Sequence, residues 1–140
     1  PGTFHSRYSL WMTKHGLTKR VARFAGKRVL VVEDEAILAM SAEDILQDLG
    51  CVVVGPALSR DEAQRFAAEA DLDAAVLDIN LGDGDSGGIA ETLAKRCVPF
   101  CFSTGYGALG VPAGFSAVPV LAKPYTSASP EDVLQQILAR

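Results

Sequence analysis

Five short apolar runs separated by amphipathic stretches constrain the fold of this chain more than any other feature. Each run has the length of a buried strand, and most lack polar alternation. The runs cover residues 28–32, 51–54, 74–79, 98–102 and 117–121. Because strands that alternate with helices favour a parallel sheet covered on both faces, the sequence predicts an α/β fold with five parallel strands.

Four helices are expected, three of them between the runs and one after the last run. The first follows Glu35 and ends at Gly50, a typical terminating glycine. The other three helices are expected to begin at or near serines, namely Ser59, Ser86 and Ser129. Ser59 and Glu62 form a capping box, and Pro130 after Ser129 stands at the first helical position. The residues predicted to face inward are Leu38, Ala42, Ile45 and Leu49; Ala63, Phe66, Ala67 and Ala70; Ile89, Leu93 and Cys97; and Val133, Leu134, Ile137 and Leu138.

A proline in the last run predicts the order of the sheet. Pro119 cannot donate a hydrogen bond to a neighbouring strand, so its strand is expected at an edge. The order 2-1-3-4-5 satisfies this and gives a doubly wound, flavodoxin-like sheet. Residues 105–114 contain four glycines and a proline, and we therefore expect the fourth helix of the alternation to be short or mobile.

Basic residues gather at the start of the chain. Residues 1–28 hold seven of the 13 Lys and Arg and none of the 17 Asp and Glu. This asymmetry indicates a solvated basic leader over residues 1–26 and a folded domain over residues 27–140. Binding of nucleic acid or an acidic partner by the leader is the alternative, for which seven charges are a weak signal. Pro1 indicates an introduced or processed end, and Met12 is a hypothetical natural start.

The sequence predicts a soluble, cytoplasmic protein. No apolar run approaches the roughly 20 residues that cross a bilayer, and we recognise no cleavable leader. Cys51, Cys97 and Cys101 lack the spacing of a metal or redox site and are predicted to be reduced core residues. We therefore expect no membrane contact.

Polar residues follow four of the predicted strands at their carboxyl ends, the edge where parallel sheets bind ligands. They are Glu33, Asp34 and Glu35, then Asp78 and Asn80, then Thr104, and finally Lys123. Clustered carboxylates raise one another's pKa unless a cation lies among them. Oxygen ligands favour a hard cation, so the pattern predicts Mg²⁺, with the hydroxyl and the lysine beside a phosphoryl group. A carboxylate that attacks phosphorus would form an acyl phosphate.

Four segments together resemble the receiver domain of two-component response regulators, the CheY-like family. They are Val-Val-Glu-Asp-Glu at 31–35, Ala-Val-Leu-Asp-Ile-Asn-Leu at 75–81, Ser-Thr-Gly at 103–105 and Lys-Pro at 123–124. The resemblance covers about residues 27–140. It implies a signalling domain rather than a multiple-turnover enzyme. Such a domain takes a phosphoryl group from a sensor histidine kinase or a small donor and is then read by a downstream protein, which the sequence does not identify.

The resemblance also implies roles for single residues. Asp78 would be the phosphoacceptor, and Asp34 and Asp78 would bind Mg²⁺ directly. Glu33 would act largely through water, and Asn80 through its backbone carbonyl. The residues implied to contact the phosphoryl group, by a hydrogen bond and an ion pair respectively, are Thr104 and Lys123.

One position departs from the family's pattern. Val120 stands where many receivers carry a switching tyrosine or phenylalanine, three residues before Lys123. Residues 99–107, Pro-Phe-Cys-Phe-Ser-Thr-Gly-Tyr-Gly, instead resemble the FATGUY subgroup, whose members are mostly single-domain receivers. We therefore expect Tyr106 and the glycines behind it to change between order and disorder, and Tyr125 to face a partner; plain packing of both tyrosines is the alternative.

Several functional alternatives stay open on the sequence. The chain could be a receiver cut from a larger transcriptional regulator, and it could be a monomer or a homodimer. A phosphatase with an aspartate nucleophile needs a second acid two residues later, where this chain has Asn80. Direct binding of nucleic acid by the folded domain is not expected.

Overall fold

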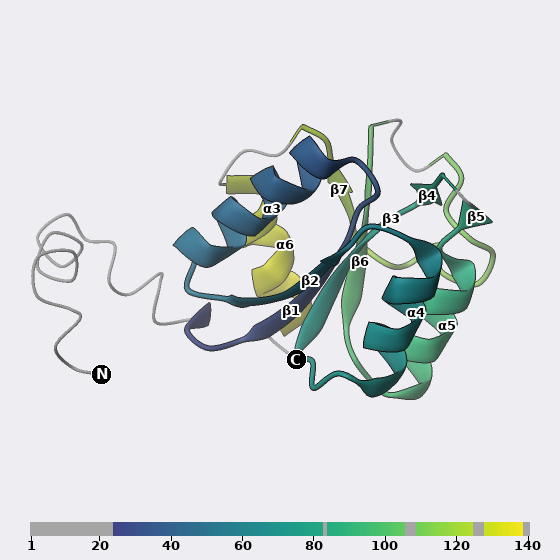
Figure 1. Cartoon of the computed structure of the whole chain (residues 1–140), viewed down its shortest axis with the longest axis horizontal. Helices are drawn as coiled ribbons and strands as arrows, with labels where there is room; N and C mark the ends of the chain where they lie inside the picture. The colour runs from purple at the N-terminus through teal and green to yellow at the C-terminus, as the bar shows by residue number, and fades with distance from the viewer. Residues whose placement is uncertain (1–23, 83, 106–108, 125–127, 139–140) are drawn as a thin grey trace, which may run out of the picture.

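The computed structural model describes residues 24–82, 84–105, 109–124 and 128–138, and it contains the predicted five-stranded parallel sheet (Figure 1). The strands are β1 Arg28–Val32, β2 Val52–Ala57, β3 Ala74–Asp78, β6 Phe100–Thr104 and β7 Val120–Ala122. Their order, β2-β1-β3-β6-β7, is the predicted 2-1-3-4-5 order. Pro119 directly precedes β7, and β7 lies at the edge of the sheet as its proline predicts.

Two layers of helices cover the sheet (Figure 1). Helices α3 (Ala36–Asp48) and α6 (Ala128–Leu138) pack on one face, and α4 (Arg60–Glu69) and α5 (Gly87–Lys95) pack on the other. Alternate residues of β1 point into the two cores that result. In β1, Val29 and Val31 join the core under α3 and α6, whereas Leu30 and Val32 join the core under α4 and α5. Burial on both faces explains why the strands read as continuous apolar runs.

The helix signals in the sequence are confirmed at two ends. Gly50 follows α3 with a φ of 94°, and the next N–H, that of Cys51, donates to the Leu46 carbonyl at 3.0 Å. Ser59 caps α4, its hydroxyl accepting from the Glu62 N–H at 3.3 Å. The Glu62 side chain accepts from the Leu58 N–H rather than from that of Ser59, so the predicted capping box closes one residue earlier.

Helix α6 differs from the prediction at its start. It begins at Ala128, so Pro130 occupies the third helical position rather than the first. The first four N–H groups of a helix have no partner within it, and a proline at the third position therefore removes no helical hydrogen bond. Leu134 and Ile137 face the core as predicted.

Cys97 corrects the prediction that all three cysteines are buried, because its side chain is exposed. The 89–93–97 spacing placed it on the inner face of a helix, but α5 ends at Lys95. Cys97 then has a φ of 59°, and the Val98 N–H donates to the Leu93 carbonyl at 3.0 Å. This is a Schellman motif with cysteine in the left-handed position that usually holds glycine. The chain thus turns away before the helical periodicity reaches Cys97.

The other two cysteines lie in the core. Burial raises the pKa of Cys51 to about 11 and that of Cys101 to about 12, so both thiols stay protonated at neutral pH. No disulfide links any of the three cysteines.

The predicted leader and the predicted fourth helix are described only in part. Residues 1–23 lie outside the described residues, whereas Phe24 is buried in the core beneath α3 and α6. Residues 109–119 form turns and no helix. Phe115, in this segment, packs onto the core beneath α4 and α5. No helix in the described part of the chain is long and apolar enough to span a membrane.

Candidate functional site

The carboxyl ends of four parallel strands bring the predicted polar residues to one edge of the sheet. Glu33 and Asp34 follow β1, Asp78 ends β3, Thr104 ends β6, and Lys123 follows β7. The register aligns these ends, since Val32 pairs with Leu77 and Asp78 with Ser103. The Lys123 N–H also donates to the Thr104 carbonyl at 2.9 Å. The parallel topology therefore gathers residues from positions 33 to 123.

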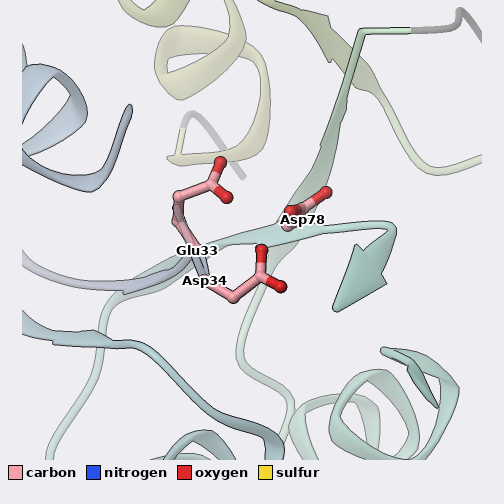
Figure 2. A group of neighbouring side chains, drawn as sticks. All are labelled: Glu33, Asp34 and Asp78. Carbon is pink, nitrogen blue, oxygen red and sulfur yellow. The ribbon is translucent and has the colours of Figure 1, made fainter. Parts of the chain in front are cut away.

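Three carboxylates lie together at this edge (Figure 2). Glu33, Asp34 and Asp78 each offer an oxygen within 4.8 Å of the others. Glu33 is 1% exposed and Asp78 6% exposed, while Asp34 is half-buried. Negative charges at such short range in a poorly hydrated place repel strongly, and the fold needs positive charge here.

Lys123 supplies part of that positive charge. Its Nζ lies 2.5 Å from Glu33 Oε1 and 3.2 Å from Asp78 Oδ2. The pKa of Asp78 is nevertheless raised to about 7, first by burial and then by the hydrogen bond and negative charge of Glu33; Lys123 offsets this only in part. When Asp78 is ionised, the three carboxylates carry more negative charge than the ammonium group of Lys123 balances, and a divalent cation would neutralise the excess.

The donor set fits magnesium. All three side chains offer oxygen, and the cluster contains no histidine or cysteine. In an octahedral Mg²⁺ site, opposite ligands lie roughly 4.2 Å apart at most. The 4.8 Å limit on the separations in this cluster is close to that span, so small side-chain movements would bring the oxygens into range. Water would complete the coordination, as is usual for Mg²⁺.

A cavity of about 420 Å³ opens beside the carboxylates. Asp78, Asn80, Thr104 and Lys123 all line it. The Asn80 N–H donates to Asp78 Oδ1 at 3.3 Å, which orients the Asp78 carboxyl from the side of β4 (Asn80–Leu81). Asp78, Asn80, Thr104 and Lys123 thus lie around a space large enough for a phosphoryl group.

A short hairpin that the sequence patterns did not predict lies next to this cavity. Strands β4 and β5 (Gly84–Asp85) pair antiparallel directly after Asp78. The Gly82 N–H donates to Asp34 Oδ2 at 2.5 Å. The run Gly-Asp-Gly-Asp at 82–85 is a typical turn composition and could have indicated the hairpin.

The two predicted switch residues cannot be placed. Tyr106 and Tyr125 lie outside the described residues. Val120, at the position where many receivers carry an aromatic side chain, is half-buried and packs with the core under α4 and α5. The expected change between order and disorder therefore stays a prediction.

Comparison with known proteins identifies the family of this fold and site. No family model matches the chain. The chain is 33% identical over 129 residues to the phyllosphere-induced regulator PhyR of Methylorubrum extorquens; the match covers 86% of the chain. It spans only 46% of PhyR, so the chain has about half the length of that relative.

Two solved structures extend the comparison over nearly their whole length. SdrG from Sphingomonas melonis is 38% identical, with a TM-score of 0.68, covering 81% of this chain and 94% of SdrG. SdrG has also been solved in a BeF3-activated conformation. The receiver domain of the sensor histidine kinase PA1611 from Pseudomonas aeruginosa is 27% identical, with a TM-score of 0.68, over 83% of this chain and all of that domain. That structure has a magnesium ion in its active site cleft. This chain belongs to the receiver domains of response regulators.

Proposed function

We propose that this receiver domain accepts a phosphoryl group on Asp78 in a reaction that requires Mg²⁺. The donor would be the phosphohistidine of a sensor histidine kinase or a small molecule such as acetyl phosphate. The observation that carries the proposal is the position of Lys123, with Nζ 2.5 Å from Glu33 and 3.2 Å from Asp78. Phosphoryl transfer needs fixed positive charge beside the nucleophile, and this lysine provides it.

Asp78 is the nucleophile in this proposal. One of its carboxylate oxygens forms a bond to phosphorus while the bond from phosphorus to the donor's nitrogen or oxygen breaks. The donor leaves with the electron pair of the broken bond, and Asp78 becomes an acyl phosphate. Lys123 would then pair with a phosphoryl oxygen, and Thr104, which lines the same cavity, would donate its hydroxyl to another.

The acidic cluster is the proposed magnesium site. Asp34 and Asp78 would bind the ion directly, Glu33 through water and Asn80 through its backbone carbonyl. A bound Mg²⁺ would favour the ionised form of Asp78 and withdraw electron density from phosphorus. The magnesium ion in the PA1611 receiver domain supports this assignment.

We further propose that a downstream protein reads the phosphorylated state and that the domain acts in the cytoplasm. Asn80 follows Asp78 where a phosphatase would need an acid, which supports a signalling domain that turns over no other phosphoester. Because PhyR is about twice as long as this chain, a second candidate is the receiver part of a longer regulator. We also propose that the chain is a member of the FATGUY subgroup, because residues 99–107 resemble the sequence signature of that subgroup.

Mass spectrometry of the intact protein tests the site. After incubation with acetyl phosphate and Mg²⁺, we expect the wild-type protein to gain one phosphoryl group and the Asp78→Asn variant to gain none. Asp48→Asn is the matched control, since Asp48 is an exposed acid at the end of α3. Phosphorylation of Asp78→Asn at the wild-type level would contradict the assignment, as would an unmodified wild-type protein after treatment with several donors.

A further inference from the structure

The hairpin of β4 and β5, which follows β3, contacts one proposed metal ligand that follows the neighbouring strand β1. Asn80 pairs with Asp85, and Leu81 pairs with Gly84. The residue after Leu81 is Gly82, whose N–H donates to Asp34 Oδ2 at 2.5 Å, although the two residues are 48 positions apart. One oxygen of the Asp34 carboxylate is therefore held by backbone from outside the acidic cluster.

The hairpin is fixed independently of the carboxylates. Leu81 is 5% exposed and belongs to the core beneath α4 and α5. Ser86 is fully buried, and both its N–H and its hydroxyl donate to the Ile79 carbonyl, at 3.3 and 3.4 Å. The guanidinium of Arg60 lies against Gly84, where a Cβ would meet it at 2.3 Å. These contacts hold β4 and β5 in place without help from the carboxylates.

The space around Gly82 matches the carboxylate closely. A Cβ at this position would lie 3.0 Å from Asp34 Oδ2, which is closer than a side chain and an oxygen normally approach. Gly82 is not among the residues with positive φ, so its backbone conformation does not by itself require glycine. A larger residue is disfavoured by the close approach of the carboxylate, because Asp34 Oδ2 would have to move by a few tenths of an ångström.

We propose that Gly82 is a positioning residue for the cation, acting through Asp34. Its N–H holds Oδ2 so that the other carboxylate oxygen turns toward Glu33 and Asp78, where the ion would bind. A carboxylate has about four lone-pair positions, so the hydrogen bond leaves room for a cation. Hydrogen bonds to metal-binding carboxylates set their orientation, and removing them typically costs about 10–100-fold in metal affinity. This inference rests on the proposed function.

Two substitutions at position 82 test the inference. Gly82→Pro removes the N–H, and Gly82→Ala keeps it but crowds Oδ2. Gly88→Ala is the matched control, because the nearest atom to a Cβ there is a Gln64 oxygen at an ordinary 3.8 Å. The measurement is the Mg²⁺ dissociation constant from an NMR titration of the full chain without any phosphodonor.

We expect a dissociation constant about tenfold higher for Gly82→Pro, at least threefold higher for Gly82→Ala, and unchanged for Gly88→Ala. A purely structural role for Gly82 would lower the melting temperature of the magnesium-free protein without changing the dissociation constant. If Gly82→Pro does not fold, Gly82→Ala decides the question. A folded Gly82→Ala with wild-type Mg²⁺ affinity would overturn the inference.

Asp34→Asn separates this inference from the proposed function. If the wild-type protein binds Mg²⁺ and Asp34→Asn weakens the binding while the position-82 variants do not, only the role of Gly82 fails. If the wild-type protein shows no saturable Mg²⁺ binding, the proposed metal site itself fails, and the role of Gly82 fails with it.

Discussion

Each end of the parallel strands carries a cavity, and the smaller cavity is the one that the polar residues of the candidate site line. At the end of the sheet where the strands begin, here called the amino edge, a cavity of about 680 Å³ is lined in part by Phe100, Phe115 and Ile137. The end where the strands finish is called the carboxyl edge. At the carboxyl edge, the space is about 420 Å³ and lies beside two buried carboxylates and a lysine. Among the described residues, the carboxyl edge alone brings together three side chains of the kinds that could hold a metal ion. Cavity volume reports imperfect packing, whereas buried like charges report an energetic cost that a ligand would relieve.

Removal of magnesium should have the largest effect, and it should act at the carboxyl edge alone. Chelation with EDTA should slow phosphorylation of Asp78 by roughly 1000-fold, because several kcal/mol of charge stabilisation are lost. The rate of acyl phosphate formation from acetyl phosphate measures this. As a control at the amino edge, Phe115→Leu should change the rate with Mg²⁺ by less than about twofold, since Phe115 lies away from the carboxylates. Equal rates of acyl phosphate formation with and without EDTA would contradict the proposal that the carboxyl edge binds Mg²⁺ for this reaction.

Substitution of Lys123 should have the next largest effect. Lys123→Met keeps most of the side-chain volume but removes the charge near Glu33 and Asp78. We expect the phosphorylation rate at pH 7 to fall by at least about tenfold, because the fixed positive charge is lost and Asp78 becomes harder to ionise. Lys95→Met, in the last turn of α5, is the matched control and should retain the wild-type rate.

The buried charge at the carboxyl edge should also appear as a pH-dependent stability. The pKa of Asp78 is about 7 in the folded protein, above its value of about 4 in an unfolded chain. The folded state therefore binds this proton more tightly, and the stability due to Asp78 is lost as the pH rises from about 4 to 7. Without Mg²⁺, Asp78→Asn should raise the free energy of unfolding by about 2 kcal/mol at pH 8 and by less at pH 5.

Urea denaturation at the two pH values measures this difference. Asp48→Asn, again the exposed control, should change the free energy of unfolding little at either pH. Adding Mg²⁺ at pH 8 should stabilise the wild-type protein more than Asp78→Asn. A stability difference that is the same at pH 5 and pH 8 would mean that Asp78 does not titrate in this range.

The smallest expected effect is on stability and comes from a substitution at the amino edge. The backbone strain there is confined to Cys97, which lies away from the candidate phosphorylation site. Cys97 lines the larger cavity and has a φ of 59°. Cys97→Gly should relieve the left-handed conformation and stabilise the protein by about 0.5 kcal/mol, with the greater flexibility of glycine offsetting part of the gain. Cys97→Ser keeps a Cβ and should show no stabilisation. Phosphorylation rates should be unchanged in both variants; a changed rate would mean that the two edges are coupled.

Most of the fold could be predicted because its signals are local. The strands read as apolar runs since both faces of the sheet are covered, and Gly50 and Ser59 mark helix ends through their own backbone chemistry. The amino end of β6 was harder. Val98 looks like part of a strand, but its N–H closes the Schellman motif of α5, and β6 begins two residues later at Phe100.

Much of the candidate site could also be predicted, since residues that follow parallel strands must meet at one edge. Asp78, Thr104 and Lys123 line one cavity for this reason. The bond from Gly82 to Asp34 could not be predicted, because it joins residues 48 positions apart and depends on how a two-residue strand pairs. The distances from Lys123 Nζ to the carboxylates of Glu33 and Asp78 could not be predicted from sequence patterns either, because they depend on the packing of the folded protein.

An NMR comparison with Mg²⁺, with and without beryllofluoride, tests the central claim most directly. Beryllofluoride stands in for the phosphoryl group, so its binding requires the acidic cluster, the hydroxyl and the lysine to act as one site. We expect large amide shifts at Asp78, Thr104 and Lys123, and little change at Lys27 and Phe115 at the opposite edge. Unchanged signals at the carboxyl edge would contradict the account.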